Sequence, residues 1–146
     1  MYSKEETQRL KHEFWVAFAE KYPRKWLLYD TKIKDFSFKF YVDNKKAQVL
    51  IAIEARNSEK REAYFEKLEA LKSILEEEFI SDLVFEKDYV LENGKTICRI
   101  WVEKTGVGFS NRNNWDSIFD FFNEKMDALE RFYLEYDEFI KDIETE

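Results

Sequence analysis

The 146-residue sequence contains only one cysteine, one proline and three glycines. Because Cys98 has no second thiol to pair with, an internal disulfide is excluded, which fits a location in the reducing cytoplasm. The scarcity of proline and glycine favours long helices and strands joined by short loops. No apolar stretch approaches the ~18 residues of a transmembrane helix, and the charged N-terminus lacks the apolar segment of a secretory signal. We therefore expect one cytoplasmic domain, residues 1–146, with no membrane partner.

Residues that commonly serve catalysis and metal binding are also scarce. A structural zinc site needs about four Cys or His ligands, whereas this chain has Cys98 and His12 in distant elements. His12 lies in a predicted helix, and neither a nucleophile elbow nor a phosphate-binding glycine loop accompanies it. The sequence thus predicts no metal, no cofactor and, in the leading interpretation, no catalytic residue.

The charge is acidic overall but unevenly distributed. The formal net charge is −7, yet residues 1–50 carry 11 basic and 7 acidic side chains, whereas residues 51–146 carry 13 and 24. This balance weighs against nonspecific binding of nucleic acid. A local basic patch around Arg24, next to Trp26, is a candidate binding site. The alternative is an ordinary solvated face.

The strongest structural pattern lies in residues 33–56, where apolar and polar residues alternate with the period of two that is typical of strands. A two-residue turn at Asn44-Lys45, where Asn tolerates a positive φ, predicts a β-hairpin. Its register pairs apolar residues on one face: Phe36–Ile53, Phe38–Ile51, Phe40–Val49 and Val42–Ala47. A shift by one residue would expose this whole set, so the register is well specified.

A second hairpin is predicted over residues 83–104, because Asn93-Gly94 is typical of a type I′ turn. A two-residue turn at this point pairs Phe85 with Val102 and Tyr89 with Cys98 on the apolar face. The same register places Lys87 on that apolar face, where it fits poorly.

Apolar periodicity of about 3.6 residues predicts helices near residues 4–21, 59–79 and 115–140. The expected fold class is α+β, with a mostly antiparallel sheet of four to five strands. Two β-hairpins joined by a crossover helix make the sheet, and the N-terminal and long C-terminal helices pack on it. Residues 26–29 are the candidate fifth strand, at an edge.

Asp35 lies opposite Glu54 in the predicted register, and Arg56 follows two residues later. Nucleases of the PD-(D/E)xK class bind a divalent metal with an Asp and a Glu on a hairpin and use a nearby Lys. Arg in place of Lys argues against this chemistry, because a guanidinium keeps its proton. The interpretation that we favour is a charge cluster in which Arg56 compensates both carboxylates. The alternative is a divergent metal-dependent nuclease.

Arg112 and Asn113 precede the last predicted helix. The backbone N–H groups at a helix N-terminus attract anions, so these two residues are candidate binding residues. Ordinary loop and capping roles are the alternative.

The last predicted helix is apolar around nearly half of its circumference, more than one contact surface requires. At about 26 residues it is also ~39 Å long. We therefore expect its far end to pack against a second surface, in a homodimer or on another protein. The predicted interface residues are Phe132, Tyr136, Phe139 and Ile140. The alternative is a helix that breaks near Arg131 and folds back.

Several stretches together resemble a known family: Glu13-Phe14-Trp15, Asp43-Asn44-Lys45-Lys46-Ala47, Gly94-Lys95-Thr96, Thr105-Gly106-Val107 and Asn111-Arg112-Asn113-Asn114-Trp115. They are similar to domain-of-unknown-function family 4268, found in bacteria and archaea, over nearly the whole chain. Members occur free-standing or appended to larger proteins, some with nuclease-like segments. The resemblance implies a prokaryotic cytoplasmic accessory domain in a nucleic-acid or defence context. It carries over no catalytic residue.

The expected function is therefore a non-catalytic binding or protein-interaction domain.

Overall fold

The computed structural model describes residues 2–145, with side chains through Ile143. Its helices are α1 (Lys4–Lys21), α2 (Ser58–Ala70), α3 (Lys72–Glu78) and α4 (Trp115–Lys141), and its strands are β1 (Phe36–Val42), β2 (Lys46–Ile53), β3 (Val84–Val90) and β4 (Thr96–Thr105). Short 3-10 turns at Arg112–Asn114 and Asp142–Thr145 flank α4. The α+β class and the four-stranded antiparallel sheet confirm the expected architecture.

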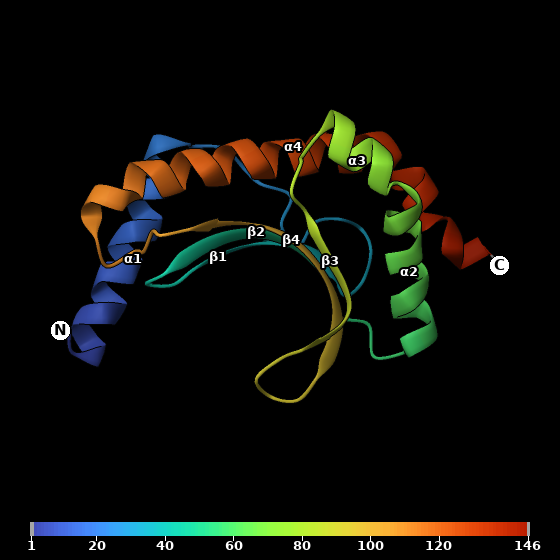
Figure 1. Ribbon diagram of the computed structural model, residues 1–146, viewed down its shortest axis with the longest axis horizontal. Helices are drawn as coiled ribbons and strands as arrows, with labels where there is room; N and C mark the ends of the chain where they lie inside the picture. The colour runs from blue at the N-terminus through green and yellow to red at the C-terminus, as the bar shows by residue number, and fades with distance from the viewer. Residues whose placement is uncertain (1, 146) are drawn as a thin grey trace.

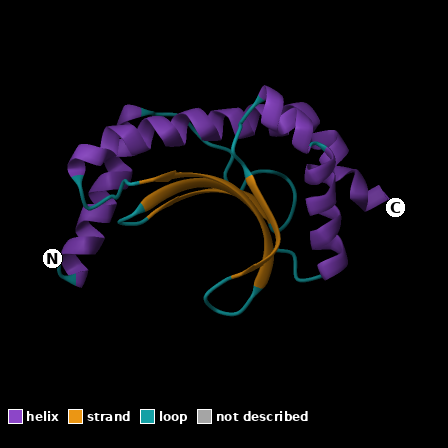
Figure 2. Ribbon diagram, viewed as in Figure 1, coloured by secondary structure: helices purple, strands orange, loops and turns teal. Residues whose placement is uncertain are grey.

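The four strands form one sheet in the order β1-β2-β4-β3, and every neighbouring pair is antiparallel. The two hairpins join through β2 and β4, so these two strands are central. The sheet is strongly curved, with α4, α2 and α3 along its outer side (Figures 1 and 2). In the described part of the chain, no helix lies on the inner side of the curve.

The first hairpin has the predicted register at every pair, from Phe36 opposite Ile53 to Val42 opposite Ala47. The expected conformation of its turn is wrong, however, because neither Asn44 nor Lys45 has a positive φ. The turn is held instead by the Asp43 carboxylate, which accepts hydrogen bonds from the N–H groups of Lys45 and Lys46 at 2.7 and 2.9 Å.

The predicted register of the second hairpin is wrong. Phe85 lies opposite Ile100 rather than Val102, and Tyr89 lies opposite Ile97 rather than Cys98. The loop has three residues, because the N–H of Leu91 donates to the carbonyl of Lys95 at 2.8 Å. Gly94 has a φ of 87°, which matches the left-handed position after a type I turn in such loops. A bulge between Glu86 and Tyr89 adds a further shift.

Two segments depart from the helix and strand predictions, and a third shows how α4 begins. The helix expected over residues 59–79 is divided at Leu71 into α2 and α3. Residues 26–29 form no strand, although the Leu28 carbonyl accepts a hydrogen bond from the Phe38 N–H at 2.9 Å. Asn114 does not cap α4 with its side chain, which instead accepts from the N–H of Gly108 at 3.0 Å.

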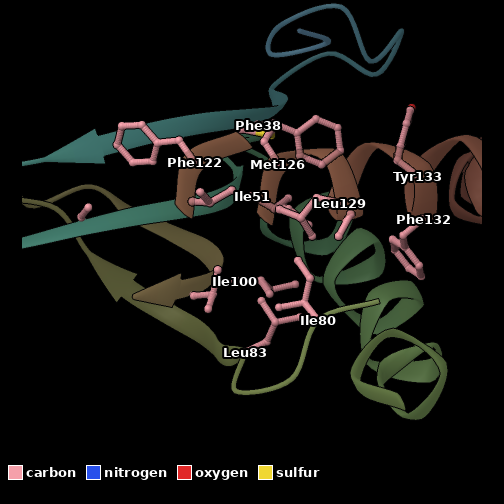
Figure 3. Packing of buried hydrophobic residues seen from close by; sticks show 14 of the residues in the cluster. Phe38, Ile51, Ile80, Leu83, Ile100, Phe122, Met126, Leu129, Phe132 and Tyr133 are labelled. Carbon is pink, nitrogen blue, oxygen red and sulfur yellow. The ribbon is translucent and has the colours of Figure 1, made fainter. Parts of the chain in front are cut away.

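The main hydrophobic cluster fills the space between the sheet and the helices. Phe38, Ile51 and Ile100 of the sheet pack with Met126 and Leu129 of α4 in this cluster (Figure 3). Cys98 is also buried there, as expected. Because the helices cover one face of the sheet, the side chains of the other face are left to form the site. Among residues 2–145, no helix has the length and apolarity needed to cross a membrane.

Candidate functional site

The inner, helix-free side of the sheet is called the concave face. Side chains on the concave face alternate along the strands with those of the core. The first hairpin and the residue after it contribute Lys39, Tyr41, Gln48, Leu50, Ala52 and Glu54, and the second hairpin contributes Tyr89, Leu91, Ile97, Arg99 and Trp101. Its hollow has a volume of about 340 Å³. This value lies near the lower end of the ~300–1,000 Å³ range of small-molecule sites.

Arg99 lies at the centre of the concave face and is only 9% exposed. Its guanidinium carbon is 4.5 Å from the centre of the Tyr89 ring and 5.3 Å from that of Trp101. Its Nη2 donates to Gln48 Oε1 at 2.5 Å, whereas its buried Nε has no hydrogen-bond partner. Within the described residues no carboxylate pairs with Arg99. A buried charge of this kind is costly unless it is paired, so the group is unusual.

A chain of polar contacts fixes the position of Arg99. Gln48 accepts from Arg99 through its carbonyl oxygen and donates through Nε2 to Glu103 Oε1 at 2.6 Å. Glu103 in turn lies 4.0 Å from the Lys46 ammonium group. Within this series of contacts the Glu103 carboxylate therefore reaches Arg99 only through the neutral amide of Gln48.

The rim of the hollow carries groups that are already engaged with one another. Lys39 Nζ contacts Glu54 Oε2 at 2.9 Å. The Tyr41 hydroxyl donates to Asp43 at 2.9 Å. Burial raises the pKa of Tyr41, and the hydrogen bond to Asp43 raises it further. Burial also raises the pKa of Asp43, but hydrogen bonds from the Lys45 N–H, the Tyr41 hydroxyl and the Lys46 N–H outweigh it and hold that pKa below its usual value.

The carboxylates of the nuclease hypothesis lie at the end of the first hairpin. Asp35 and Glu54 are adjacent, because the N–H of Glu54 donates to the carbonyl of Asp35 at 2.7 Å. With Arg56 they line a second hollow of about 540 Å³ that also contains Lys34 and Lys95. Glu54 is neutralised by Lys39 rather than by Arg56. Among the side chains described, no group of three or more His, Cys, Asp or Glu residues is placed to hold a metal ion.

Arg24 and Trp26 lie together on the segment between α1 and β1. The Arg24 guanidinium stacks 4.0 Å from the centre of the Trp26 ring and pairs with Asp127 and Glu130 at 2.9 and 2.8 Å. Trp26 in turn stacks on Phe18 in the aromatic cluster. Arg24 thus holds this segment against α4, and Trp26 packs it against α1.

Arg112 forms an ion pair with Glu13 of α1 and stacks over Trp115. Asn113 is exposed, and its backbone N–H donates to the side chain of Asn111 at 3.0 Å. Arg112 therefore connects the start of α4 to α1, and its charge is already paired.

Helix α4 runs unbroken past Arg131 to Lys141. Phe132 and Ile140 are buried within the chain itself, with Phe132 in edge contact with Phe79 at 5.5 Å between ring centres. Tyr136 is half-buried, and Phe139 is 42% exposed beneath the Lys67 ammonium group. Of the four predicted interface residues, Tyr136 and Phe139 reach the surface.

Sequence reasoning missed the concave-face site because of the register in the second hairpin. The expected two-residue turn directed Tyr89 to the helix side with Cys98, whereas the three-residue loop and the bulge direct it to the concave face beside Arg99. Lys87, which fitted poorly on the helix side in the expected register, gave no signal of this change, because it stays on that side. In the structure Lys87 pairs with Glu62 of α2 at 3.0 Å.

The fold and the site define a small α+β domain with a hollow on the helix-free face of an antiparallel sheet, centred on a buried arginine. The model of the family described as domain of unknown function DUF4268 matches residues 10–137, and the chain belongs to that family. No curated protein and no solved structure matches the chain.

Proposed function

We propose that this chain is a non-catalytic binding domain and that the concave face is its binding surface. The observation that carries the proposal is Arg99, a buried cation with an unpartnered Nε and, among the described residues, no hydrogen bond or ion pair to a carboxylate, although Glu86 lies opposite it in the strand register. A ligand that supplies the missing acceptor compensates a desolvated charge, and this favours binding. The apolar residues Leu50, Ala52 and Ile97 next to it supply contact area for the rest of the ligand.

The nuclease alternative, with Asp35 and Glu54 as metal ligands, has less support. Its Glu54 carboxylate already has a cationic partner in Lys39 at 2.9 Å. Metal binding would have to displace this ion pair, and Arg56 is a poor group for proton transfer.

An interaction with a second protein chain has its strongest support at the exposed part of α4. Phe139 and Leu134 are 42% and 62% exposed there. A homodimer formed on this side would use Tyr136 and Phe139, since Phe132 and Ile140 are already buried. A cytoplasmic location agrees with the lone Cys98 thiol, and a prokaryotic accessory role agrees with the family resemblance.

The test is amide chemical-shift mapping of the ¹⁵N-labelled protein against a library of small fragments, followed by Mg²⁺ and labelled DNA. We expect fragments to perturb the amides of Gln48, Ala52, Tyr89 and Ile97 together. Perturbations confined to other surfaces would contradict the proposal. Mg²⁺-dependent cleavage of DNA that Glu54→Ala abolishes would establish the nuclease alternative.

A further inference from the structure

We propose that the ligand of the concave face is a small organic anion, a planar apolar ring bearing a carboxylate or phosphate group, and that Arg99 receives the anionic group. This inference rests on the binding role proposed above and assigns the ligand class. Three features of the described residues carry it: the geometry of Arg99, the charge of the lining and the size of the hollow.

Arg99 is held in an orientation that leaves donors free. Gln48 occupies Nη2, and Tyr89 and Trp101 contact the guanidinium plane. The hydrogen bond to Gln48 is the one that Arg99 makes within the described chain, so Nε and Nη1 donate to no group there. Nη2 carries a second N–H besides the one bonded to Gln48, and this N–H forms a two-donor edge with either the Nε–H or an Nη1–H. Such an edge matches the two oxygens of a carboxylate or phosphate. Gln48 is a positioning residue, because its amide fixes the direction in which the remaining donors point.

The charge of the lining favours an anion even though the whole protein is acidic. Three cations line the hollow, Lys39, Lys46 and Arg99, against the two carboxylates of Glu54 and Glu92. Lys39 already pairs with Glu54 at 2.9 Å, and Lys46 lies 4.0 Å from Glu103 at the rim. Arg99 is therefore the cation of this lining that has no short contact to a carboxylate. An anion that contacts it gains attraction in a partly desolvated site.

The remaining lining favours a flat apolar group of small size. Leu50, Ala52 and Ile97 form a separate buried apolar cluster against which Tyr89, Leu91 and Trp101 pack. The hollow of about 340 Å³ holds a single ring system with its substituents. A nucleic-acid strand would extend beyond it, along the neighbouring hollow that contains Lys34 and Lys95.

The experiment uses pairs of probes that differ only in the anionic group: 2-aminobenzoate against 2-aminobenzamide, and adenosine 5′-monophosphate against adenosine. Inorganic phosphate is titrated as well. Binding is followed by the Nε–H resonance of Arg99 and the amides of the concave face. In at least one pair, we expect the affinity of the anionic probe to exceed that of its neutral partner by about tenfold or more. Phosphate alone should shift the Arg99 Nε–H signal.

Two variants make the test specific. The exchange variant Gln48→Glu/Glu103→Gln places a carboxylate against Arg99 and keeps a donor and an acceptor facing each other at positions 48 and 103. The protein should therefore stay folded while affinity for the anionic probe falls about tenfold. Lys34→Ala removes a cation from the neighbouring hollow and should leave the affinity unchanged. Unaltered binding by Gln48→Glu/Glu103→Gln would overturn the role of Arg99, even if Arg99→Leu fails to fold.

The outcomes separate this inference from the proposed function. Equal affinities of charged and neutral probes for the concave face would contradict the anionic ligand class but not the proposed binding surface. The absence of any shift on this face with all the probes would overturn both proposals. If a single-stranded oligonucleotide bound much more tightly than the small probes and with strong salt dependence, the ligand would be a nucleic acid rather than a small anion.

Discussion

The ion pair between Arg24 and Glu130 gives the sharpest prediction of stability. Glu130 is only 5% exposed, and its two oxygens accept from Arg24 Nη2 at 2.8 Å and from the Leu27 N–H at 2.6 Å. This carboxylate thus anchors the segment between α1 and β1 on α4. Replacing Arg24 by Ala leaves a buried carboxylate with a single backbone donor.

The magnitude follows from burial. Removing one partner of a fully buried pair costs about 3–5 kcal/mol. The side chain of Arg24 is 39% exposed, so water compensates part of the loss. We expect Arg24→Ala to lower the free energy of unfolding by about 2–3 kcal/mol. Arg131→Ala is the matched control, since its pair with Asp127 is an exposed i,i+4 contact worth about 0.3–0.5 kcal/mol.

Urea unfolding followed by far-UV circular dichroism measures both variants. The Arg24→Ala/Glu130→Ala double variant should lose less than the sum of the single variants, because it leaves no buried charge without a partner. If Arg24→Ala cost no more than Arg131→Ala, the segment would not depend on this pair. Arg24 and Trp26 would then be free to act as the ligand-binding pair that the sequence predicted.

Three further perturbations test the fold. Phe38→Ala should cost about 3–5 kcal/mol in urea unfolding, whereas Tyr41→Ala, on the opposite face of the same strand, should cost about 1 kcal/mol; similar costs would mean that the faces are misassigned. Burial raises the pKa of Cys98 to about 11, so the folded protein should not react with a disulfide reagent at pH 8, and rapid reaction would contradict this burial. Gly108→Ala should lower the melting temperature by several degrees, because its Cβ would lie 2.4 Å from the Asn44 carbonyl oxygen; an unchanged melting temperature would contradict this tight packing.

The first hairpin was predictable from the sequence because a single consistent pattern specified it. Seven pairs from Phe36–Ile53 to Val42–Ala47 follow from alternation about one turn, and each apolar pair would be exposed by a shift of one residue. The conformation of the turn was less predictable. Asp43 satisfies its N–H groups from outside the two central residues, so no residue with a positive φ was needed.

The second hairpin shows the limit of the same reasoning. Asn93-Gly94 fits both a two-residue turn and a three-residue loop with Gly94 in the left-handed position, and the two solutions differ in register. Burial in β3 does not decide between them, because none of the residues of this edge strand is buried. The pairing of β2 with β4, which connects residues 46–53 to residues 98–105, leaves no local trace in the sequence.

The concave face departs from the regular pattern of a sheet that is covered on one side. Such a sheet usually presents polar residues to water on its open face. Here Leu50, Ala52 and Ile97 lie on the open face and are at most 4% exposed. They are covered by Tyr89 and Trp101, which the bulged second hairpin directs inward, and not by a helix. This second apolar layer lies beside Arg99, which is 9% exposed. Departures from local regularity concentrate at functional sites, and on this sheet they coincide with its one buried arginine.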